Sequence, residues 1–454
     1  MSGTRDQGSI LGTMPVDRLV LTMSAPIMVS MLVSAVYNLV DSIYVAQVSD
    51  LDFLALSYAY PVQLMMVAFC TGIGVGFNAT FAQRLGEGKG EEANRVACHG
   101  FLFYTLCWLL FLAFALFGAP LFFRLSTGDP VVARAGVEYL TICCGASIGM
   151  CMQFLTERLL QTTGHPAGFM IVQGSGAVLN IVLDPVFIFG LDMGVAGAAV
   201  ATVIGQISGA CIGFFLLWRI RREFSVSFRG FRPSGALSGE MLRIAAPAVV
   251  MQSLSSFMSL GLNQLLTLWS QTGVFVLGVY FKIQTFVFMP IFGVSNGLIP
   301  ILSYNYGAKS PGRITRSIRF SLALAVGIGL GGAVLLCLAA SPLLRYCFQA
   351  GAQAAAMGGP ALRMTALAFP IAAVSIILSA SFQSLGRSTL SLLVSLLRQI
   401  VLLLPIAALF LYLVPGQVWL SFLCAEVLSC LAAAALYRRT IRPKIRALAQ
   451  GRSQ

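Results

Sequence analysis

Long apolar segments, separated by short polar stretches, recur along the whole chain. Each holds roughly 20 or more residues with few charges, which is the length and composition of a transmembrane helix. Some are longer than a bilayer requires, so we expect tilted helices or helices that extend beyond the membrane. Twelve such segments are predicted, at residues 19–47, 53–81, 96–118, 132–156, 166–190, 194–218, 240–269, 274–303, 317–340, 357–383, 388–413 and 416–437.

The composition agrees with this pattern. Of the 454 residues, 58% are hydrophobic and only 10% are charged, whereas a soluble domain carries about 25% charged residues. The first 17 residues are polar and mixed, so we predict no removable signal peptide. The sequence therefore predicts an all-α integral membrane protein.

The distribution of positive charge predicts the orientation of the segments. Most of the 29 Lys and Arg residues lie in the termini and in alternate connections, whereas the other connections carry Asp50, Asp52, Asp129 and Asp192. Lys and Arg favour cytoplasmic loops, so we predict a multi-pass protein of the cell (inner or plasma) membrane with both termini cytoplasmic. The net charge of +13 is then a topology signal, and no nucleic-acid partner is expected. The basic positions are Arg84, Lys89, Arg95, Arg219, Arg221, Arg222, Arg229, Arg232, Lys309, Arg313, Arg316, Arg319 and the tail from Arg438 to Arg452.

The two halves of the chain repeat each other. Six spans are an even number, so two six-span halves share one orientation. We predict an N-terminal six-helix lobe at 1–218, a cytoplasmic linker at 219–239 and a C-terminal six-helix lobe with a basic tail at 240–454. Matching residues at a shift of 221 are Leu21 and Leu242, Ala25 and Ala246, Pro26 and Pro247, Gly72 and Gly293, Gly76 and Gly297, Gly86 and Gly307, and Arg95 and Arg316; at a shift of 222 they are Gln161 and Gln383, and Gly164 and Gly386.

Two carboxylates lie inside the apolar segments of the first half. Asp41 is the only charged residue between Arg18 and Asp50, and Asp184 lies within the fifth segment. An ionisable group at membrane depth costs roughly 2.5–3.5 kcal/mol on insertion scales, so it indicates function. At about 1.5 Å per residue, both carboxylates lie at one depth in the outer half of the bundle.

Other oxygen-bearing side chains lie at the same level. Tyr139 and Thr202 match this depth, Asn180 precedes Asp184 by one turn, and Tyr37 and Asn38 share a helix face with Asp41. Such oxygens can hold a proton, or bind Na⁺ at Asp41, Asn180, Asp184 and Thr202. The alternative is a hydrogen-bonded cluster that only joins the helices.

The second half lacks this set. The positions that match Asp41 and Asp184 fall at Leu262 and near Ile406. Arg398 and Glu426 lie near the middle of neighbouring spans, and we predict a structural ion pair between them. Lys282 has no predicted partner, and cavity lining and snorkelling to the interface remain open for it.

Several long side chains in both halves are candidates for lining a substrate cavity. Met and Phe adapt to varied ligands, although at helical spacing they also fill cores or face lipid. The candidates are Gln63, Met65, Met66, Gln252, Met258, Lys282, Phe286 and Met289. The eleven Cys lie almost entirely within apolar segments and show no metal-ligand spacing with the two His, so we interpret them as small buried apolar residues and predict no metal centre.

Three stretches are distinctive: MSAPIMVSMLVSAVYNLVDSIYVAQ at 23–47, LLQTTGHP before the fifth segment and LNIVLDPVFIFG within it. Together with the twelve spans in a six-plus-six repeat, they resemble the multidrug and toxic compound extrusion (MATE) family, in its bacterial DinF-like branch. The resemblance implies a V-shaped pair of six-helix lobes. It also implies export of organic, often cationic, compounds against inward flow of H⁺ or Na⁺, by a monomer without other cofactors.

The resemblance also assigns residues. It implies ion coupling by Asp41, Asn180, Asp184, Tyr139 and Thr202, and a bend of the first span at Pro26. Other branches of the family use a glutamate in the seventh span. Here that span has no acidic residue after Glu240, so a cation site in the second half is not predicted.

Two other functions were weighed. A flippase or exporter of lipid-linked or amphiphilic metabolites normally has more spans and a strongly cationic cavity, and this chain has few intramembrane cations. A membrane-embedded lipid enzyme would need a catalytic constellation. The sequence contains no HExxH or GxSxG motif, and His99 and His165 are isolated, so we do not predict an enzyme.

Overall fold

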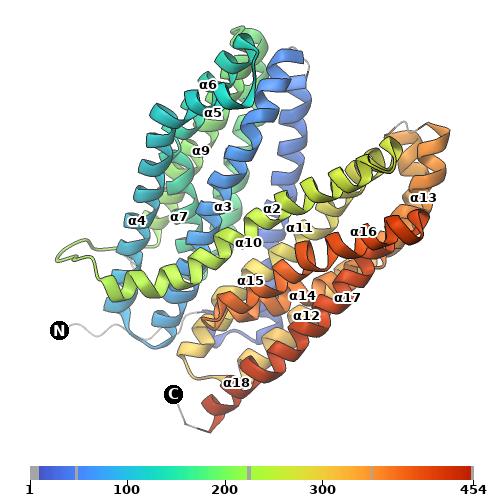
Figure 1. Ribbon diagram of the computed structural model, residues 1–454. Coiled ribbons are helices and arrows are strands. Elements are labelled where there is room, and N and C mark those ends of the chain that lie inside the picture. Colours follow the sequence, from blue (N-terminus) through green and yellow to red (C-terminus); the bar gives the residue numbers. More distant parts are fainter. Residues whose placement is uncertain (1–9, 47–49, 222–225, 349–350, 451–454) are drawn as a thin grey trace. The chain divides into compact units, whose positions relative to one another are not determined.

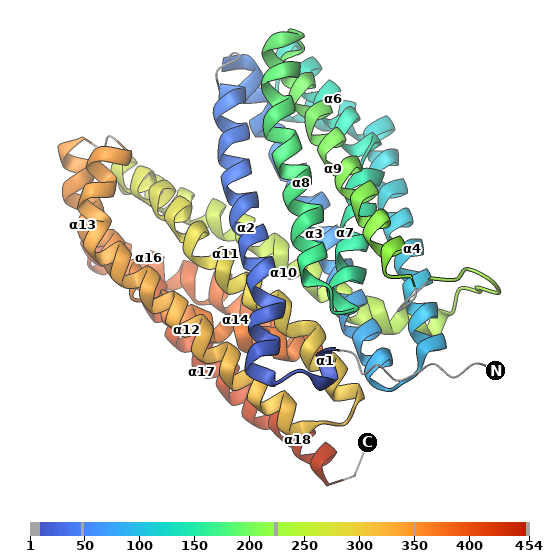
Figure 2. The ribbon, with the colours of Figure 1, turned by 180° about the vertical axis from the view of Figure 1, so that it is seen from behind.

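The computed structural model describes residues 10–46, 50–221, 226–348 and 351–450, and their regular secondary structure is helical (Figure 1, Figure 2). Several side chains between residues 38 and 53, Asn38 and Asp41 among them, lie outside the described set. Ten helices are long and apolar enough to span a membrane, and two bent helix pairs bring the number to twelve in the described chain. The predicted all-α architecture with twelve spans is therefore confirmed.

The helices of the first half follow the predicted segments, and most of them extend beyond the predicted bounds. After a short α1 (Ile10–Thr13) come α2 (Val16–Ala46), α3 (Asp50–Gly86), α4 (Gly90–Ala113), α5 (Ala119–Ser126), α6 (Pro130–Gly145), α7 (Ile148–Thr162), α8 (Pro166–Pro185) and α9 (Gly194–Arg219). Short π-helical segments join α4 to α5 and extend α8. Pro at the start of α6 and α8 suits the first helical turn, where the backbone N–H groups have no partner inside the helix.

The helices of the second half repeat this register. α3 and α11 have equal lengths and begin at residues that the repeat aligns, and α6 and α13 end at aligned residues. α6 and α7 meet at a 41° bend, and α13 and α14 meet at a 42° bend. The bounds are α10 (Gly235–Thr267), α11 (Gln271–Gly307), α12 (Pro311–Pro342), α13 (Ala352–Ala366), α14 (Phe369–Ser384), α15 (Ser388–Leu396), α16 (Leu403–Leu413), α17 (Leu420–Leu436) and α18 (Arg442–Ala449).

Two packing units divide the chain, and two helices contribute to both. Unit 1 contains Val29–Val249, and unit 2 contains Leu11–Met28 and the chain from Val250 onward. The change falls at aligned positions of the repeat in α2 and α10, in each case shortly after a proline, Pro26 or Pro247. The packing units and the predicted lobes thus assign the first halves of α2 and α10 differently, and the lobes as functional units stay a prediction.

Glycines on α3 and α11 allow close packing against the first parts of α10 and α2, which belong to unit 1 and unit 2 respectively. A Cβ at Gly72 would lie 2.7 Å from the backbone nitrogen of Val249 in unit 1. In unit 2, a Cβ at Gly293 would lie 2.7 Å from the Cα of Met28. Each glycine pairs with the residue that the repeat predicts, so both halves use the same backbone approach.

An ion-pair network fixes the start of α10 within unit 1. The guanidinium of Arg84 lies 2.7 Å from a Glu240 carboxylate oxygen and 3.3 Å from one of Glu87. Burial would raise the pKa of Glu87, but hydrogen bonds and the charges of Arg84 and Lys89 hold that pKa below its usual value. The predicted acidic edge of the seventh span is therefore part of a surface network.

The predicted fourth span ends too early. The sequence pattern placed its end at residue 156, but α7 continues to Thr162. Glu157 and Arg158, which the prediction left outside the span, are 2% and 4% exposed within the helix bundle. The two charged side chains interrupt the apolar pattern, yet they are held inside the bundle by Gln153 and Gln161 on α7 itself, and Arg158 also lies over the Phe169 ring of α8.

Candidate functional site

A hydrogen-bonded polar cluster joins α8 and α9 inside unit 1. The amide nitrogen of Asn180 donates to a carboxylate oxygen of Asp184 at 3.2 Å and is 3.2 Å from the hydroxyl oxygen of Thr202. Asp184 is fully buried and Asn180 is 2% exposed. The carbonyl oxygen of Asn180 accepts no hydrogen bond from the described residues. Carboxylate, amide and hydroxyl oxygens at one point are ligands that suit a proton or a hard cation.

Small residues let the two helices meet beside this cluster. A Cβ at Gly176 would lie 2.9 Å from the carbonyl oxygen of Gly205, and one at Gly205 would lie 2.7 Å from the carbonyl oxygen of Gly176. Gly176 lies one helical turn from Asn180, so the backbone contact sets the distance between Asn180 and Thr202. Figure 2 shows α8 and α9 running side by side.

The other predicted coupling residues are placed less completely. Tyr139 is 2% exposed on α6, and its hydroxyl accepts a hydrogen bond from the amide of Gln63 on α3. Tyr37 is half-buried on α2. The side chains of Asn38 and Asp41 lie outside the described residues, so their place in the cluster stays a prediction.

A second buried polar group, which the sequence prediction missed, lies on α7. The amide of Gln153 donates to the Glu157 carboxylate at 3.0 Å. The side chain of Gln153 packs on Gly209 of α9 and lies near Gly176 of α8. The Gln153 side chain therefore lies where α7 meets α8 and α9. The i, i+4 spacing of Gln153, Glu157 and Gln161 was the available signal.

Arg158 lies on the neighbouring face of α7. Its guanidinium donates to the amide oxygen of Gln161 at 3.0 Å and lies 5.5 Å from the ring centroid of Phe169. Gln161 also accepts from Asn78 at 3.0 Å. No ion pair joins Arg158 to an acidic residue among those described, so the aromatic ring and amides stabilise this buried cation.

The predicted cavity residues differ widely in exposure. Met66 is buried in the core of unit 1, where its sulfur lies 3.5 Å from the Cys144 thiol. Met65 and Phe286 are exposed, as are Gln252 and Lys282. Gln63, Met258 and Met289 are half-buried. Gln63 is the member that also contacts the coupling set, through Tyr139.

Arg398 and Glu426 lie together inside unit 2. The guanidinium Nε is 3.5 Å from a Glu426 carboxylate oxygen, and both side chains are largely buried. The other carboxylate oxygen of Glu426 has no hydrogen-bond partner among the described residues. Pro26 lies within helix α2, which continues on both sides of it, and the bend of the first span there stays a prediction.

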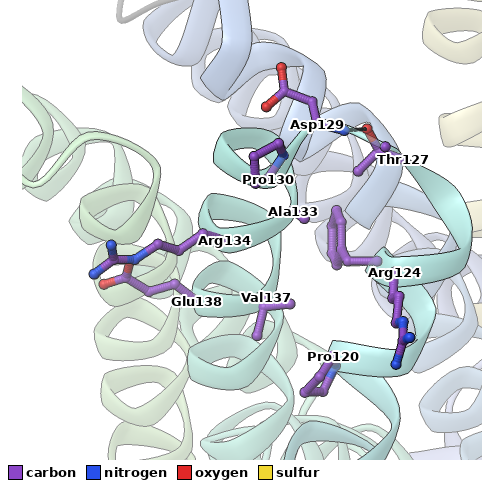
Figure 3. A pocket seen from close by; sticks show the side chains of 11 residues that line it. Pro120, Arg124, Thr127, Asp129, Pro130, Ala133, Arg134, Val137 and Glu138 are labelled. Atoms are coloured by element: carbon purple, nitrogen blue, oxygen red, sulfur yellow. Dashed lines mark hydrogen bonds between the residues drawn. The ribbon is translucent and has the colours of Figure 1, made fainter.

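An open pocket of about 750 Å³ lies elsewhere in unit 1, between α5 and α6. The residues that line it include Pro120, Arg124, Asp129, Arg134 and Glu138 (Figure 3). None of the predicted coupling or cavity residues lines it. We therefore place the candidate site at the Asp184 cluster rather than at this pocket.

The chain matches proteins of known families over almost its full length. The MatE family profile matches residues 26–186 and 247–409. The multidrug export protein MepA of Staphylococcus aureus (strain MRSA252) is 24% identical over 429 residues, which cover 92% of this chain and 93% of MepA. The FAD transporter of Shewanella oneidensis is 22% identical over 411 residues, with 89% and 90% covered.

Solved structures show the same fold. A multidrug resistance MATE transporter of the MOP superfamily in an outward-facing conformation superposes with a TM-score of 0.90 at 24% identity, covering 98% of this chain and 99% of that one. A MOP superfamily transporter from Pyrococcus furiosus superposes with a TM-score of 0.87 at 23% identity, covering 97% and 98%.

Proposed function

Since the chain belongs to the MatE family, the multidrug and toxic compound extrusion (MATE) transporters, we propose that it exports organic, often cationic, compounds by antiport with H⁺ or Na⁺. Family membership makes it a multi-pass membrane transporter and not an enzyme. The names of its relatives, a multidrug exporter and an FAD transporter, support small-molecule substrates. The second name also keeps export of a larger amphiphilic metabolite as the alternative.

The observation that carries the coupling proposal is the buried Asp184–Asn180–Thr202 cluster. Unit 2 has no equivalent, because the matching positions hold Leu402 and Ile406. A buried carboxylate changes its charge when it binds a proton or a cation, and neutralisation lowers the cost of desolvating its surroundings. We place ion coupling in unit 1, with Asp41 as the predicted second carboxylate.

In this proposal, ion and substrate exclude each other. Ion binding at Asp184 and Asp41 favours a state with low substrate affinity, and loss of the ion favours a state that binds substrate. This is a negative coupling free energy between two ligands. Bending of α2 at Pro26, where a backbone N–H is missing, would convert one state into the other.

The substitution Asp184→Asn tests the coupling. Asparagine keeps an oxygen that accepts the Asn180 hydrogen bond but removes the titration and the negative charge. We expect a folded protein that binds substrate, with gradient-driven efflux reduced to the level of protein-free vesicles. Efflux from proteoliposomes under an imposed H⁺ gradient, and separately under a Na⁺ gradient, measures this and identifies the ion.

The matched control is Asp192→Asn, the same chemical change at an exposed acidic residue between α8 and α9. Asparagine tolerates the positive φ of 53° there, so efflux should be unchanged. Full efflux by the Asp184→Asn protein under either gradient would make Asp184 a structural residue and remove ion coupling from this cluster.

We further propose that the protein is a monomer of the plasma membrane with both termini cytoplasmic. The segment between α9 and α10 is rich in Arg, which favours the cytoplasmic side. A single cysteine at Arg229, in a cysteine-free background, should react with a membrane-impermeant thiol reagent only after the cells are opened. Labelling of this cysteine in intact cells would reverse the proposed orientation.

A further inference from the structure

Three helices of unit 1 bring three thiols to one point. Cys70 on α3, Cys107 on α4 and Cys151 on α7 have Sγ atoms that all lie within 4.8 Å of one another. The Sγ atoms of Cys70 and Cys151 are 3.8 Å apart. The three side chains are at most 4% exposed, and α3, α4 and α7 pack against one another around them (Figure 1).

This geometry fits a three-coordinate soft metal. Three sulfurs in a plane around one metal, at metal–sulfur distances of about 2.3 Å, lie about 4 Å from each other. Thiolate ligands select soft ions such as Cu(I). Zn²⁺ prefers four ligands, and among the described residues the cluster contains three. We propose that Cys70, Cys107 and Cys151 form a binding site for Cu(I), independent of the transport function proposed above.

The next layer of the same three helices supplies a positive charge. Arg158 lies two helical turns after Cys151 on α7, and Tyr104 lies one turn from Cys107 on α4. The Tyr104 hydroxyl donates to the Cys70 carbonyl at 3.0 Å. A Cβ at Gly74 would be 2.8 Å from Arg158 Nε and 3.0 Å from the Tyr104 hydroxyl. Glycine at this position, one helical turn after Cys70 on α3, therefore leaves room for both groups.

The charge of Arg158 suits a metal–thiolate site. Its Nε is buried without a hydrogen-bond partner among the described residues, and no described acidic residue forms an ion pair with it. Thiols release their protons when they bind a metal, so Cu(I) with its thiolates carries net negative charge. A buried negative charge is costly when unpaired, and Arg158, two turns from Cys151 on α7, provides a cation in the same helix bundle.

Further sulfur atoms lie one turn away. Met66 precedes Cys70 by one helical turn on α3, and its Sδ is 3.5 Å from the Cys144 thiol. Thioether and thiol sulfurs are both soft ligands. Met66 and Cys144 are thus two further soft sulfur groups in the same core as the three-thiol cluster.

Anaerobic titration of the purified full-length protein with Cu(I), against a colourless-to-coloured Cu(I) chelator, tests the site. The background carries Cys211→Ser and Cys347→Ser, which removes the exposed thiols. We expect one tightly held Cu(I) per chain, at least two protons released, and X-ray absorption showing three sulfur neighbours. Cu(I) should raise the melting temperature, and Cys107→Ser should abolish that rise and weaken binding at least tenfold.

The matched control is Cys98→Ser, which changes another buried thiol on the same helix α4. It should keep both the binding and the thermal shift. Cys151→Ala provides a second cluster variant if Cys107→Ser does not fold. Equal Cu(I) binding by the cluster and control variants would overturn the proposal, as would two sulfur neighbours or tighter binding of Zn²⁺ than of Cu(I).

Discussion

The two packing units are built on one helical frame but have different interiors. The bend between α6 and α7 is 41° and the bend between α13 and α14 is 42°. On α7 of unit 1 the inward positions are Gln153, Glu157 and Gln161, whereas α14 of unit 2 has Ser375, Ser379 and Gln383 at the matching places. Unit 1 therefore buries long polar side chains where unit 2 buries mostly short ones.

The same contrast continues on the following helices. The Asp184–Asn180 pair of α8 corresponds to Ile406 and Leu402 in unit 2. Unit 2 has its own buried charges, Arg398 and Glu426, and the matching positions in unit 1 hold Gly176 and Ile204. Glycines, prolines and helix ends define the shared frame, while the buried polar residues define what each unit can do. The functional residues are therefore expected among the buried polar side chains that differ between the two units.

The largest loss of unfolding free energy is expected when the buried Arg398–Glu426 ion pair of unit 2 is broken. Arg398→Ala or Glu426→Ala alone leaves one uncompensated charge inside the bundle, at a cost of roughly 3–5 kcal/mol. The double substitution removes both charges and should recover part of that loss. Denaturant titration in mixed micelles measures the free energy of unfolding of the three variants.

The Arg398→Ala, Glu426→Ala double variant also tests whether ion coupling belongs to unit 1 alone. If coupling belongs to unit 1, the double variant keeps the ion dependence of efflux. A well-folded double variant that has lost all ion dependence would show that unit 2 takes part in coupling.

The sequence predicted the helices and their repeat better than it predicted which polar residues are buried between them. The matching of Pro26 with Pro247 and of Gly72 with Gly293 set the register that the helix bounds follow. Glu157 and Arg158 were missed because charged residues after an apolar run normally mark the end of a span. Their partners Gln153 and Gln161 lie within one turn on the same helix, so the spacing held a signal for this polar group, whereas the contact of Arg158 with the Phe169 ring of α8 is one that no local pattern contains.

A smaller loss of unfolding free energy is expected when alanine replaces a glycine at a close contact between two helices. A Cβ at Gly76 would lie 2.6 Å from the backbone carbonyl of Met241, whereas one at Gly297 would lie 2.7 Å from the Ser24 hydroxyl. A backbone carbonyl cannot move aside, but a hydroxyl can rotate. Gly76→Ala should therefore cost about 1–3 kcal/mol of unfolding free energy, and Gly297→Ala should cost less.

The combination of Gly297→Ala with Ser24→Ala sharpens this difference, because it removes the obstructing oxygen. Gly297→Ala should therefore cost less in the Ser24→Ala background than in the protein that retains Ser24. Equal losses for Gly76→Ala and Gly297→Ala would show that the two contacts are equally tight. The nature of the opposing atom would then not distinguish the units.

The smallest effect concerns the turn after α3 and its counterpart after α11. Gly88 has a φ of 72°, and Lys309, which the repeat aligns with it, has a φ of 51°. Their N–H groups donate to the carbonyls of Leu85 and Tyr306, at 3.0 and 3.1 Å, so both turns have the same hydrogen bond. A lysine in this left-handed region carries a strain of roughly 1–2 kcal/mol that glycine avoids.

Lys309→Gly should therefore stabilise the protein. Glycine gives back about 0.5–1 kcal/mol through the entropy of the unfolded chain, so the net gain is roughly 0.5–1 kcal/mol, detectable as a higher melting temperature. The adjacent control is Ala308→Gly, where φ is −74° and glycine relieves no strain, so that change should lower the melting temperature. If the two substitutions lower it equally, the second turn is unstrained. The lysine would then fit this position as well as glycine fits the first turn.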